Sequence, residues 1–381
     1  MGITRIADVT GLDRIGIPVA MAVRPNSRSV SVAQGKGQTA ELAFASAVME
    51  AVETWHAEDL GDRIRFARRR ELATRADVLD PATLCRTNRI PTDDTQIGWI
   101  DGTPLPPGRG ERLGEGGTCW VPAELIHTDY TLPPAPGAGY FLASTNGLAS
   151  GNNALEAISA AICEGVERDA VALWHARAPQ SRAASHLDLE SVNDAGCRAL
   201  LNKYATAAII VRAWDLTSDI GIPAFLCWIR EADARNATMK QTFAGAGCHP
   251  DPAVALSRAL TEAAQTRLNV IVGARDDLPT EYIVPAAAAV GPVLMDAFAA
   301  TVPALRFGDV AGLRSDDLAD DVRWELARLR GAGLARAIMV DLTRADIGIP
   351  VVRVVVPGLE GDCHHLGYTP GARARGVGDR A

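Results

Sequence analysis

The sequence predicts a mixed α/β protein: a single body of pseudo-repeated strand and helix units around one central cavity. Two kinds of internal repeat lead to this fold class. One is an Ala-rich helix that carries acidic residues, and the other is a buried strand that follows an Ile-Gly-Ile-Pro sequence. The two repeats interleave along the chain, which argues against dividing its 381 residues into independent halves. We expect one domain over residues 1–361 and a flexible C-terminal tail over residues 362–381.

The helix repeat is clearest in residues 35–58 (GKGQTAELAFASAVMEAVETWHAE) and 151–174 (GNNALEAISAAICEGVERDAVALW). Each segment has a Gly-containing turn, good helix formers and two polar positions three residues apart, which share one helix face. A weaker third copy covers residues 249–267. The paired positions are Glu50 and Glu53 in the first copy, Glu164 and Glu167 in the second, and Glu262 and Gln265 in the third.

The strand repeat consists of three Ile-Gly-Ile-Pro sequences that end at Pro18, Pro223 and Pro350. Each is followed by an apolar run typical of a buried strand. Proline suits the first residue of a strand, where no backbone donor is needed. The sequence therefore predicts three buried strands that begin just after these prolines.

Composition narrows the function classes. A net charge of −8 gives no general attraction to nucleic acid or to acidic membranes, and 48% apolar residues are enough for a large core. We expect no transmembrane helix and no signal peptide. Residues 101–117 resemble a surface loop. Seven scattered cysteines without a Cys-x-x-Cys pair suit free thiols in the cytoplasm. Residues 363–365, Cys-His-His, have no matching ligand pair at a zinc-type spacing, so we interpret them as a polar loop.

The acidic positions of residues 151–174 raise a chemical question. Glu156, Glu164, Glu167 and Arg168 share an arc of roughly 120°, but their neighbours on that arc are mostly alanines, which would be odd on a wetted face. An unpaired buried carboxylate costs several kcal/mol. If the acidic faces of the three helix copies converge inside the protein, their five glutamates would together cost more than a typical net stability of about 5–15 kcal/mol. Cations are therefore required, and an all-oxygen site favours Mg²⁺, which usually binds beside phosphates.

The flanking residues fit a phosphate ligand. Lys36 lies in a Gly-Lys-Gly turn, residues 146–152 form a small-residue loop before a helix N-terminus, and Arg258 precedes Glu262 by one helical turn. Three interpretations stay open from the residues alone: a Mg-nucleotide site, a metal-free network of salt bridges, and a di-metal hydrolase.

Four segments resemble the successive signatures of the YcaO superfamily, in order and over nearly the whole chain: GKGQTAELAFASAVMEAVE, NGLASGNNALEAISAAICEGVERDA, GAGCHPDPAVALSRALTEAAQTR and IPVVRVVVPGLEG. The resemblance implies a central nucleotide cavity and an enzyme that uses ATP and Mg²⁺ to activate a peptide backbone amide. The amide oxygen takes the γ-phosphoryl group while a nucleophile adds to the carbonyl carbon. Azolines, thioamides or amidines result.

The resemblance also implies roles for individual residues. The Mg²⁺ ligands carried over by motif are Glu50, Glu53, Glu164, Glu167 and Glu262. The nucleotide-binding residues are Lys36, Ser46, Asn152, Glu156, Arg168, Arg258 and Glu262. The catalytic set consists of Glu50, Glu53, Glu164, Glu167 and Arg258. The chain departs from the pattern at Thr54, where many members have Arg.

The C-terminal sequence GYTPGARARGVGDRA differs from the Pro-x-Pro-x-Pro ending of many azoline-forming members. It is more similar to members paired with a TfuA protein, many of which are linked to thioamide formation. The resemblance thus implies modification of a ribosomally made precursor peptide, with a TfuA-type partner and a possible homodimer, and without nucleic acid or membrane. Azoline formation is the alternative, and a di-metal hydrolase or a non-catalytic docking homologue are more remote ones.

Three further features have less specific interpretations. His249 follows Cys248, but adjacent strand residues point to opposite faces, so a structural role is favoured over a nucleophile pair. Trp55 and Trp174 follow the Glu-x-x-Glu pairs and are predicted to be core residues. The basic run at residues 66–71 predicts a solvated face, with contact to an acidic leader peptide as the alternative.

Overall fold

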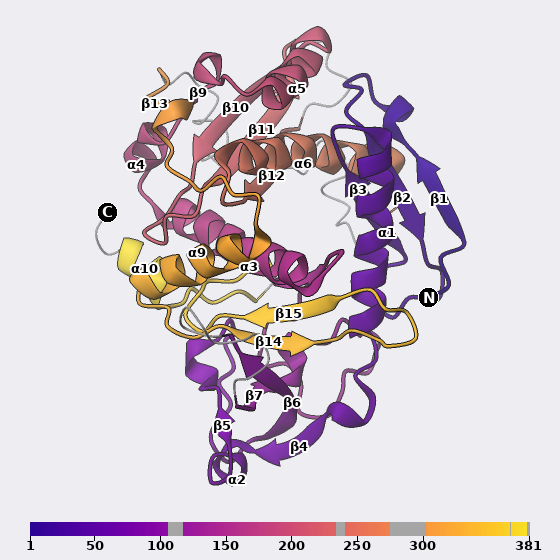
Figure 1. Ribbon diagram of the computed structural model, residues 1–381, viewed down its shortest axis with the longest axis vertical. Helices are drawn as coiled ribbons and strands as arrows, with labels where there is room; N and C mark the ends of the chain where they lie inside the picture. The colour runs from indigo at the N-terminus through magenta and orange to yellow at the C-terminus, as the bar shows by residue number, and fades with distance from the viewer. Residues whose placement is uncertain (106–116, 234–240, 275–301, 366, 379–381) are drawn as a thin grey trace. The chain divides into compact units, whose positions relative to one another are not determined.

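The computed structural model describes residues 1–105, 117–233, 241–274, 302–365 and 367–378. The chain divides into two compact units, each assembled from separate stretches of sequence. The first unit consists of Met1–Asn26, Val30–Ala51 and Arg177–Arg314, and the second of Ser27–Ser29, Val52–Ala176 and Ser315–Ala381. The mixed α/β class is confirmed (Figure 1). The segments of the two units alternate along the sequence.

The described part of the first unit contains two three-stranded antiparallel sheets, β1-β2-β3 and β10-β11-β12, and the short parallel pair β9 and β13. The strands are β1 (Arg5–Asp8), β2 (Val19–Val23), β3 (Val32–Lys36), β9 (Leu187–Asp188), β10 (Ile209–Asp215), β11 (Ala224–Glu231), β12 (Phe243–Cys248) and β13 (Leu305–Arg306). The helices are α4 (Pro179–Ala184), α5 (Ala195–Thr206), α6 (Pro252–Val272) and most of α1 (Ala40–Ala57). Helix α6 packs along the β10–β12 sheet (Figure 1).

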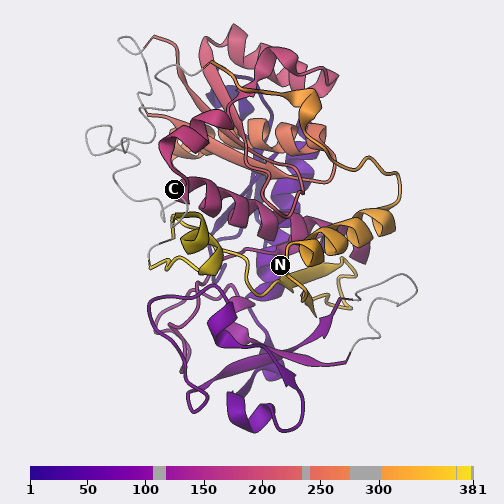
Figure 2. The same ribbon diagram turned by 90° about the vertical axis from the view of Figure 1, so that its left-hand side faces the viewer.

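The described part of the second unit contains a seven-stranded sheet of order β5-β7-β6-β14-β15-β8, with β4 also paired to β6. The strands are β4 (Arg65–Arg68), β5 (Asp77–Val78), β6 (Gln96–Pro104), β7 (Cys119–Pro122), β8 (Leu148–Ser150), β14 (Ile338–Asp341) and β15 (Val351–Val355). The helices are α2 (Arg69–Leu72), α3 (Ala154–Ala176), α9 (Leu318–Gly331) and α10 (Ala372–Gly378). Helices α9 and α10 both pack against α3 (Figures 1 and 2).

The three strands predicted after the Ile-Gly-Ile-Pro sequences are confirmed as β2, β11 and β15. Each pairs antiparallel with the strand that leads into an Ala-rich helix. In every case the proline carbonyl accepts a hydrogen bond from the residue just after that second strand. The three bonds are Gly37 N–H to Pro18 (3.2 Å), His249 N–H to Pro223 (3.1 Å) and Gly151 N–H to Pro350 (3.2 Å). The two sequence repeats are therefore parts of one strand–strand–helix unit, present as β2-β3-α1, β11-β12-α6 and β15-β8-α3.

Glycine in the second strand and alanine on the helix allow these elements to approach closely. A Cβ added at Gly35 of β3 would lie 2.0 Å from the backbone nitrogen of Ala47 in α1. A Cβ added at Gly247 of β12 would lie 2.2 Å from the carbonyl oxygen of Ala255 in α6. Such distances exclude any side chain without movement of the backbone. The close approach explains why these helices are rich in alanine.

Two parts of the chain differ from the expectations. Residues 372–378 form α10, whereas the sequence predicts a flexible tail over residues 362–381. The reason is the fully buried Asp169 of α3, whose two carboxylate oxygens accept from Nε and Nη2 of Arg373, each at 2.9 Å. Asp101–Pro104 belong to β6 rather than to the predicted surface loop, of which residues 106–116 lie outside the described residues. No described helix is long and apolar enough to cross a lipid bilayer.

Candidate functional site

In the first unit, strand backbone orients two of the predicted acidic ligands in the same way. The Gln34 N–H of β3 donates to Oε2 of Glu50 on α1, at 3.1 Å. The Ala246 N–H of β12 donates to Oε1 of Glu262 on α6, at 3.3 Å. These donors directly precede Gly35 and Gly247, two of the glycines at which strand and helix approach closely. The local packing of each copy thus fixes its acid with a neutral backbone donor.

Lys36, at the end of β3, forms an ion pair with Glu262 across the first unit. Its Nζ lies 2.5 Å from Oε2 of Glu262, and both side chains are mostly buried. Gln265, one helical turn after Glu262, donates its Nε2 hydrogen to the carbonyl oxygen of Gln34 at 2.5 Å. A carboxylate at position 265 has no hydrogen to donate there. At its two paired positions, the third copy of the helix repeat therefore has one acid, Glu262, and one amide with a structural role, Gln265.

Arg258 and His249 interact electrostatically near the start of α6. Burial first, and then the positive charge of Arg258, lower the pKa of His249 to about 4. The neutral ring accepts the Asp251 N–H at Nδ1, 3.0 Å away, and Asp251 in turn caps α6 through Ala253 N–H. These bonds support the structural role predicted for His249. Ser46 is half-buried on α1, one turn before Glu50.

The start of α3 is built by two asparagines and a glutamate. Oδ1 of Asn153 accepts the Glu156 N–H at 3.1 Å, which caps the start of the helix. Oε2 of Glu156 accepts both the backbone N–H and the Nδ2 hydrogen of Asn152, each at 2.9 Å. Asn152 and Glu156, predicted to bind nucleotide, are thus held together as one polar group at a helix N-terminus.

In the second unit, the backbone at β8 orients two more acids. The Ser150 N–H and hydroxyl both donate to Oε1 of Glu53, at 2.9 and 2.6 Å. The Gly147 N–H donates to Oε2 of Glu164 at 3.1 Å. Glu50 lies in the first unit and Glu53 in the second, because the boundary between the units crosses α1. The predicted Glu-x-x-Glu pair of the first copy is therefore shared between the two units.

The polar stripe of α3 is not a wetted face. Glu167 is 5% exposed, and its Oε1 lies 3.5 Å from Nη2 of Arg168. Trp174 is buried, as predicted for a core residue. Trp55 is only half-buried, and the Arg344 guanidinium lies 4.4 Å from its ring centroid, so its core prediction is only partly correct.

The predicted site residues thus fall into two groups, one in each unit. The first unit contains Lys36, Ser46, Glu50, Arg258 and Glu262, and the second contains Glu53, Asn152, Glu156, Glu164, Glu167 and Arg168. Backbone N–H groups donate to four of the predicted metal-binding acids, Glu50, Glu53, Glu164 and Glu262. The basic run is paired instead with surface acids, as expected for a solvated face: Arg68 with Glu71, Arg69 with Asp93, and Arg70 with Asp94.

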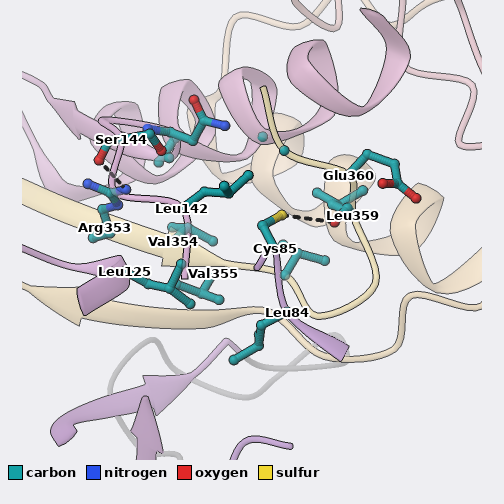
Figure 3. A pocket seen from close by; sticks show the side chains of 16 residues that line it. Leu84, Cys85, Leu125, Leu142, Ser144, Arg353, Val354, Val355, Leu359 and Glu360 are labelled. Carbon is teal, nitrogen blue, oxygen red and sulfur yellow. Dashed lines mark hydrogen bonds between the residues drawn. The ribbon is translucent and has the colours of Figure 1, made fainter. Parts of the chain in front are cut away.

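Arg353 is a buried cation that the sequence analysis does not single out. It lies on β15, is 2% exposed and lines a cavity of about 70 Å³ together with Cys85 and Gly147 (Figure 3). Its Nη2 donates to the Ser144 carbonyl at 2.8 Å. Burial lowers the pKa of Arg353, while the negative charge of Glu164 opposes this shift. The one signal in the sequence is a lone arginine inside the apolar run of the third Ile-Gly-Ile-Pro strand.

Glu325 is a second buried ionisable residue that the sequence analysis does not single out. This α9 residue is 0% exposed and accepts hydrogen bonds from Ser159 Oγ (2.6 Å) and Cys163 Sγ (3.4 Å) of α3. Burial raises the pKa of Glu325 well above its usual range. Six of the fourteen α9 residues are charged, so a glutamate among them gives no sign of burial.

Solved structures share the fold over almost the whole chain. A heterocyclase described in complex with substrate and cofactor superposes with a TM-score of 0.75 and 25% identity, over 98% of this chain and 51% of that one. This chain therefore spans about half the length of that heterocyclase. YcaO from Methanopyrus kandleri, bound with AMPPCP and Mg²⁺, superposes with a TM-score of 0.72 and 23% identity, over 97% of this chain and 90% of that one.

The sequence is similar to two uncharacterised proteins and matches a family model. A Rhizobium leguminosarum bv. trifolii protein, described as uncharacterised and in the tfuA 3′ region, is 37% identical over 95% of this chain and 84% of its own length. An uncharacterised protein of Methanothermobacter thermautotrophicus is 35% identical over 94% of this chain and 90% of its own length. The family model of the YcaO cyclodehydratases, described as ATP- and Mg²⁺-binding, matches residues 34–360. The chain therefore belongs to the YcaO family of ATP- and Mg²⁺-binding proteins.

Proposed function

We propose that this chain uses ATP and Mg²⁺ to convert a backbone amide of a ribosomally made peptide into a thioamide, together with a TfuA-type partner protein. The amide oxygen attacks the γ-phosphorus, and ADP leaves. A sulfur nucleophile then adds to the amide carbon, and loss of phosphate and a proton completes the thioamide. The observation that carries the choice of thioamide is the relative in the tfuA 3′ region, which is 37% identical to this chain.

We assign Mg²⁺ binding to the five carboxylates Glu50, Glu53, Glu164, Glu167 and Glu262. Carboxylate oxygens are the hard ligands that Mg²⁺ prefers, so the donor set fits this ion. The backbone N–H groups of Gln34, Ala246 and Gly147 each bind one oxygen of Glu50, Glu262 and Glu164, and the other oxygen of Glu262 accepts from Lys36. Bound Mg²⁺ would neutralise charge on the transferred phosphoryl group.

The nucleotide is assigned to the cationic and polar groups that match the family motifs: Lys36, Ser46, Asn152, Glu156, Arg168, Arg258 and Glu262. Lys36 and Arg258 would screen phosphate charge, and such preorganised charge is usually the largest catalytic contribution. The Asn152–Glu156 pair offers amide and carboxylate groups from one fixed position at the start of α3. Because phosphoryl transfer needs little covalent chemistry from a protein, positioning by these groups would supply much of the rate enhancement.

Four of the seven cysteines are poorly suited to supply sulfur, which supports a sulfur source outside this chain. Burial raises the pKa values of Cys85, Cys119 and Cys197 to about 12, and it raises the pKa of Cys227 further. A thiol with such a pKa stays protonated near neutral pH and is a poor nucleophile. These side chains are therefore suited to packing rather than to carrying sulfur.

Azoline formation is the second candidate. Two observations favour it: the family model is described as a cyclodehydratase, and a heterocyclase in complex with substrate and cofactor has the same fold at 25% identity. In that reaction a neighbouring Cys, Ser or Thr side chain of the peptide would add to the activated amide, and the product would have lost one water.

Mass spectrometry distinguishes the two products. The full chain is incubated with ATP, Mg²⁺, sulfide, a TfuA-type partner and a candidate precursor peptide, with a Glu164→Gln variant as the inactive control. Thioamide formation raises the peptide mass by the difference between sulfur and oxygen, and only when sulfide is present. A loss of water that needs no sulfide would replace the thioamide proposal with azoline formation.

A further inference from the structure

A group of soft metal ligands lies in the second unit, apart from the acids assigned to Mg²⁺. His175 near the end of α3 and the adjacent residues Cys363 and His364 place one nitrogen or sulfur atom each within 4.8 Å of one another. The two imidazole rings are edge-on, with centroids 4.8 Å apart and planes at 85°. Two imidazoles and a thiol are ligands that zinc prefers, whereas Mg²⁺ prefers oxygen.

The backbone around Cys363 and His364 is fixed by a turn. Oδ1 of Asp362 accepts the His364 N–H at 2.9 Å, and the Asp362 carbonyl accepts the His365 N–H at 3.1 Å. Cys363 and His175 are half-buried, while His364 is exposed, which gives an ion a route from solvent. The ligands are thus presented from a defined turn and from a long helix rather than from loose surface loops.

The two segments that carry the ligands are also tied to each other. Asp169 of α3 accepts the Glu360 N–H at 2.9 Å. The Glu360 carboxylate in turn accepts from the Tyr368 hydroxyl and from the Gly371 and Ala374 N–H groups, at 2.7–2.9 Å. This network ties Glu360, and through it Tyr368, Gly371 and Ala374, to α3 on both sides of the Cys363–His364 pair.

We propose that His175, Cys363 and His364 bind one Zn²⁺ ion and leave a fourth coordination position open to water or an exogenous ligand. Zn–S and Zn–N bonds of about 2.3 and 2.0–2.1 Å would place the ligand atoms within about 4 Å of one another. Small side-chain rotations therefore complete the site. On binding, the Zn–S bond forms as the Cys363 thiol releases its proton to solvent. The further ligand that the sequence around residues 363 and 364 lacks is His175, which comes from a distant part of the chain. Under this proposal residues 363 and 364 are metal ligands and not only part of a polar loop.

Cobalt titration of the full chain tests the proposal. The metal-free protein is kept in excess Mg²⁺, which occupies carboxylate sites, and Co²⁺ is added in steps. The expected result is one equivalent of Co²⁺ with the visible bands of a tetrahedral ion and a thiolate-to-cobalt charge-transfer band, all displaced by one equivalent of Zn²⁺. Loss of even an outer-shell partner typically weakens a site by about 10- to 100-fold. We therefore expect Cys363→Ser and His364→Asn each to weaken Zn²⁺ binding by at least about 100-fold.

Two neighbouring variants are matched controls. Cys85→Ser removes another thiol of the same unit, and His365→Asn removes the adjacent imidazole; both should bind one Zn²⁺ with unchanged affinity. His364 is exposed, so its variant is expected to fold even if Cys363→Ser does not, and a thermal melt checks both. Absence of the charge-transfer band in the unsubstituted chain would overturn the proposal. Full Zn²⁺ affinity in a folded His364→Asn variant would overturn it too.

Discussion

The β11-β12-α6 copy and the β15-β8-α3 copy share their backbone but differ in their chemistry. In both, the proline carbonyl at the start of the first strand accepts an N–H from the residue after the second strand. At the two acidic positions, however, α3 has Glu164 and Glu167, whereas α6 has Glu262 and Gln265. Gln265 uses its amide to bind the Gln34 carbonyl. The second acid is therefore not required by the strand–strand–helix scaffold, which points to a functional reason for keeping it in α3.

The largest expected effect comes from removing the α3 acids. Glu164→Gln and Glu167→Gln keep the shape and the acceptor oxygen but remove the charge that would bind Mg²⁺. We expect each to lower ATP turnover by about 100-fold or more, as for loss of a group that stabilises transition-state charge, without loss of thermal stability. The measurement is steady-state ATP hydrolysis with substrate peptide present, beside a thermal melt. Glu41→Gln, an exposed acid of α1, is the control. Near-normal turnover in either α3 variant would refute the assignment.

The shared scaffold is tested by filling the strand–helix contact. A methyl group at Gly247 would lie 2.2 Å from the Ala255 carbonyl oxygen, so Gly247→Ala must displace α6. Overpacking of this kind typically costs about 1–3 kcal/mol. We expect a matching drop in the free energy of unfolding, measured by urea denaturation. The control is Gly331→Ala at the end of α9, where an added Cβ meets nothing within 4 Å; it should leave stability unchanged or slightly higher. Equal stability of the two variants would contradict the close-packing account.

The difference at position 265 is tested by restoring the acid. Gln265→Glu replaces the donor to the Gln34 carbonyl with a carboxylate that repels it, and an unsatisfied buried polar group costs about 1–3 kcal/mol. We expect a lower thermal midpoint and no gain in ATP turnover. Gln38→Glu, an exposed glutamine of the same unit, is the control. If Gln265→Glu raised both stability and turnover, the amide would have no structural role.

A smaller effect concerns the buried acid Glu325, which packs against α3 but lies outside the proposed site. Its pKa is raised in the folded protein, so its contribution to stability is complete below its ordinary pKa of 4.5 and is lost as pH rises through the folded pKa. We expect Glu325→Gln to remove this loss and to make the thermal midpoint less dependent on pH. Melts across a pH series give the comparison, with Asp320→Asn on the exposed face of α9 as control. An unchanged pH dependence would show that Glu325 does not titrate as described.

Local signals explain what the sequence predicted well. Proline and glycine mark strand starts and turns, so the strands after Pro18, Pro223 and Pro350 could be predicted. Residues three apart share a helix face, so the common face of the α3 acids could be predicted too. The bond between Asn153 and the Glu156 N–H follows from the same local geometry.

Contacts between distant segments explain what could not be predicted. The Asp169–Arg373 pair, which orders α10, joins residues far apart in sequence, and neither shows its partner locally. The same holds for His175 and Cys363, which approach only because the chain returns to α3. The assignment of Glu50 and Glu53 to different units likewise depends on tertiary packing. The periodicity of a single helix gives no information about such packing.

Calorimetric titration with ATP tests the central claim, that the acids of the three repeat helices bind ATP through Mg²⁺. The account predicts binding of one ATP per chain in the presence of Mg²⁺, loss of this binding in EDTA, and much weaker binding by Glu164→Gln, while Glu41→Gln binds normally. A parallel thermal melt should rise, since a ligand at 100 times its Kd adds about 2.7 kcal/mol of stability. ATP binding of equal strength with and without Mg²⁺, or no binding at millimolar Mg-ATP, would contradict the account.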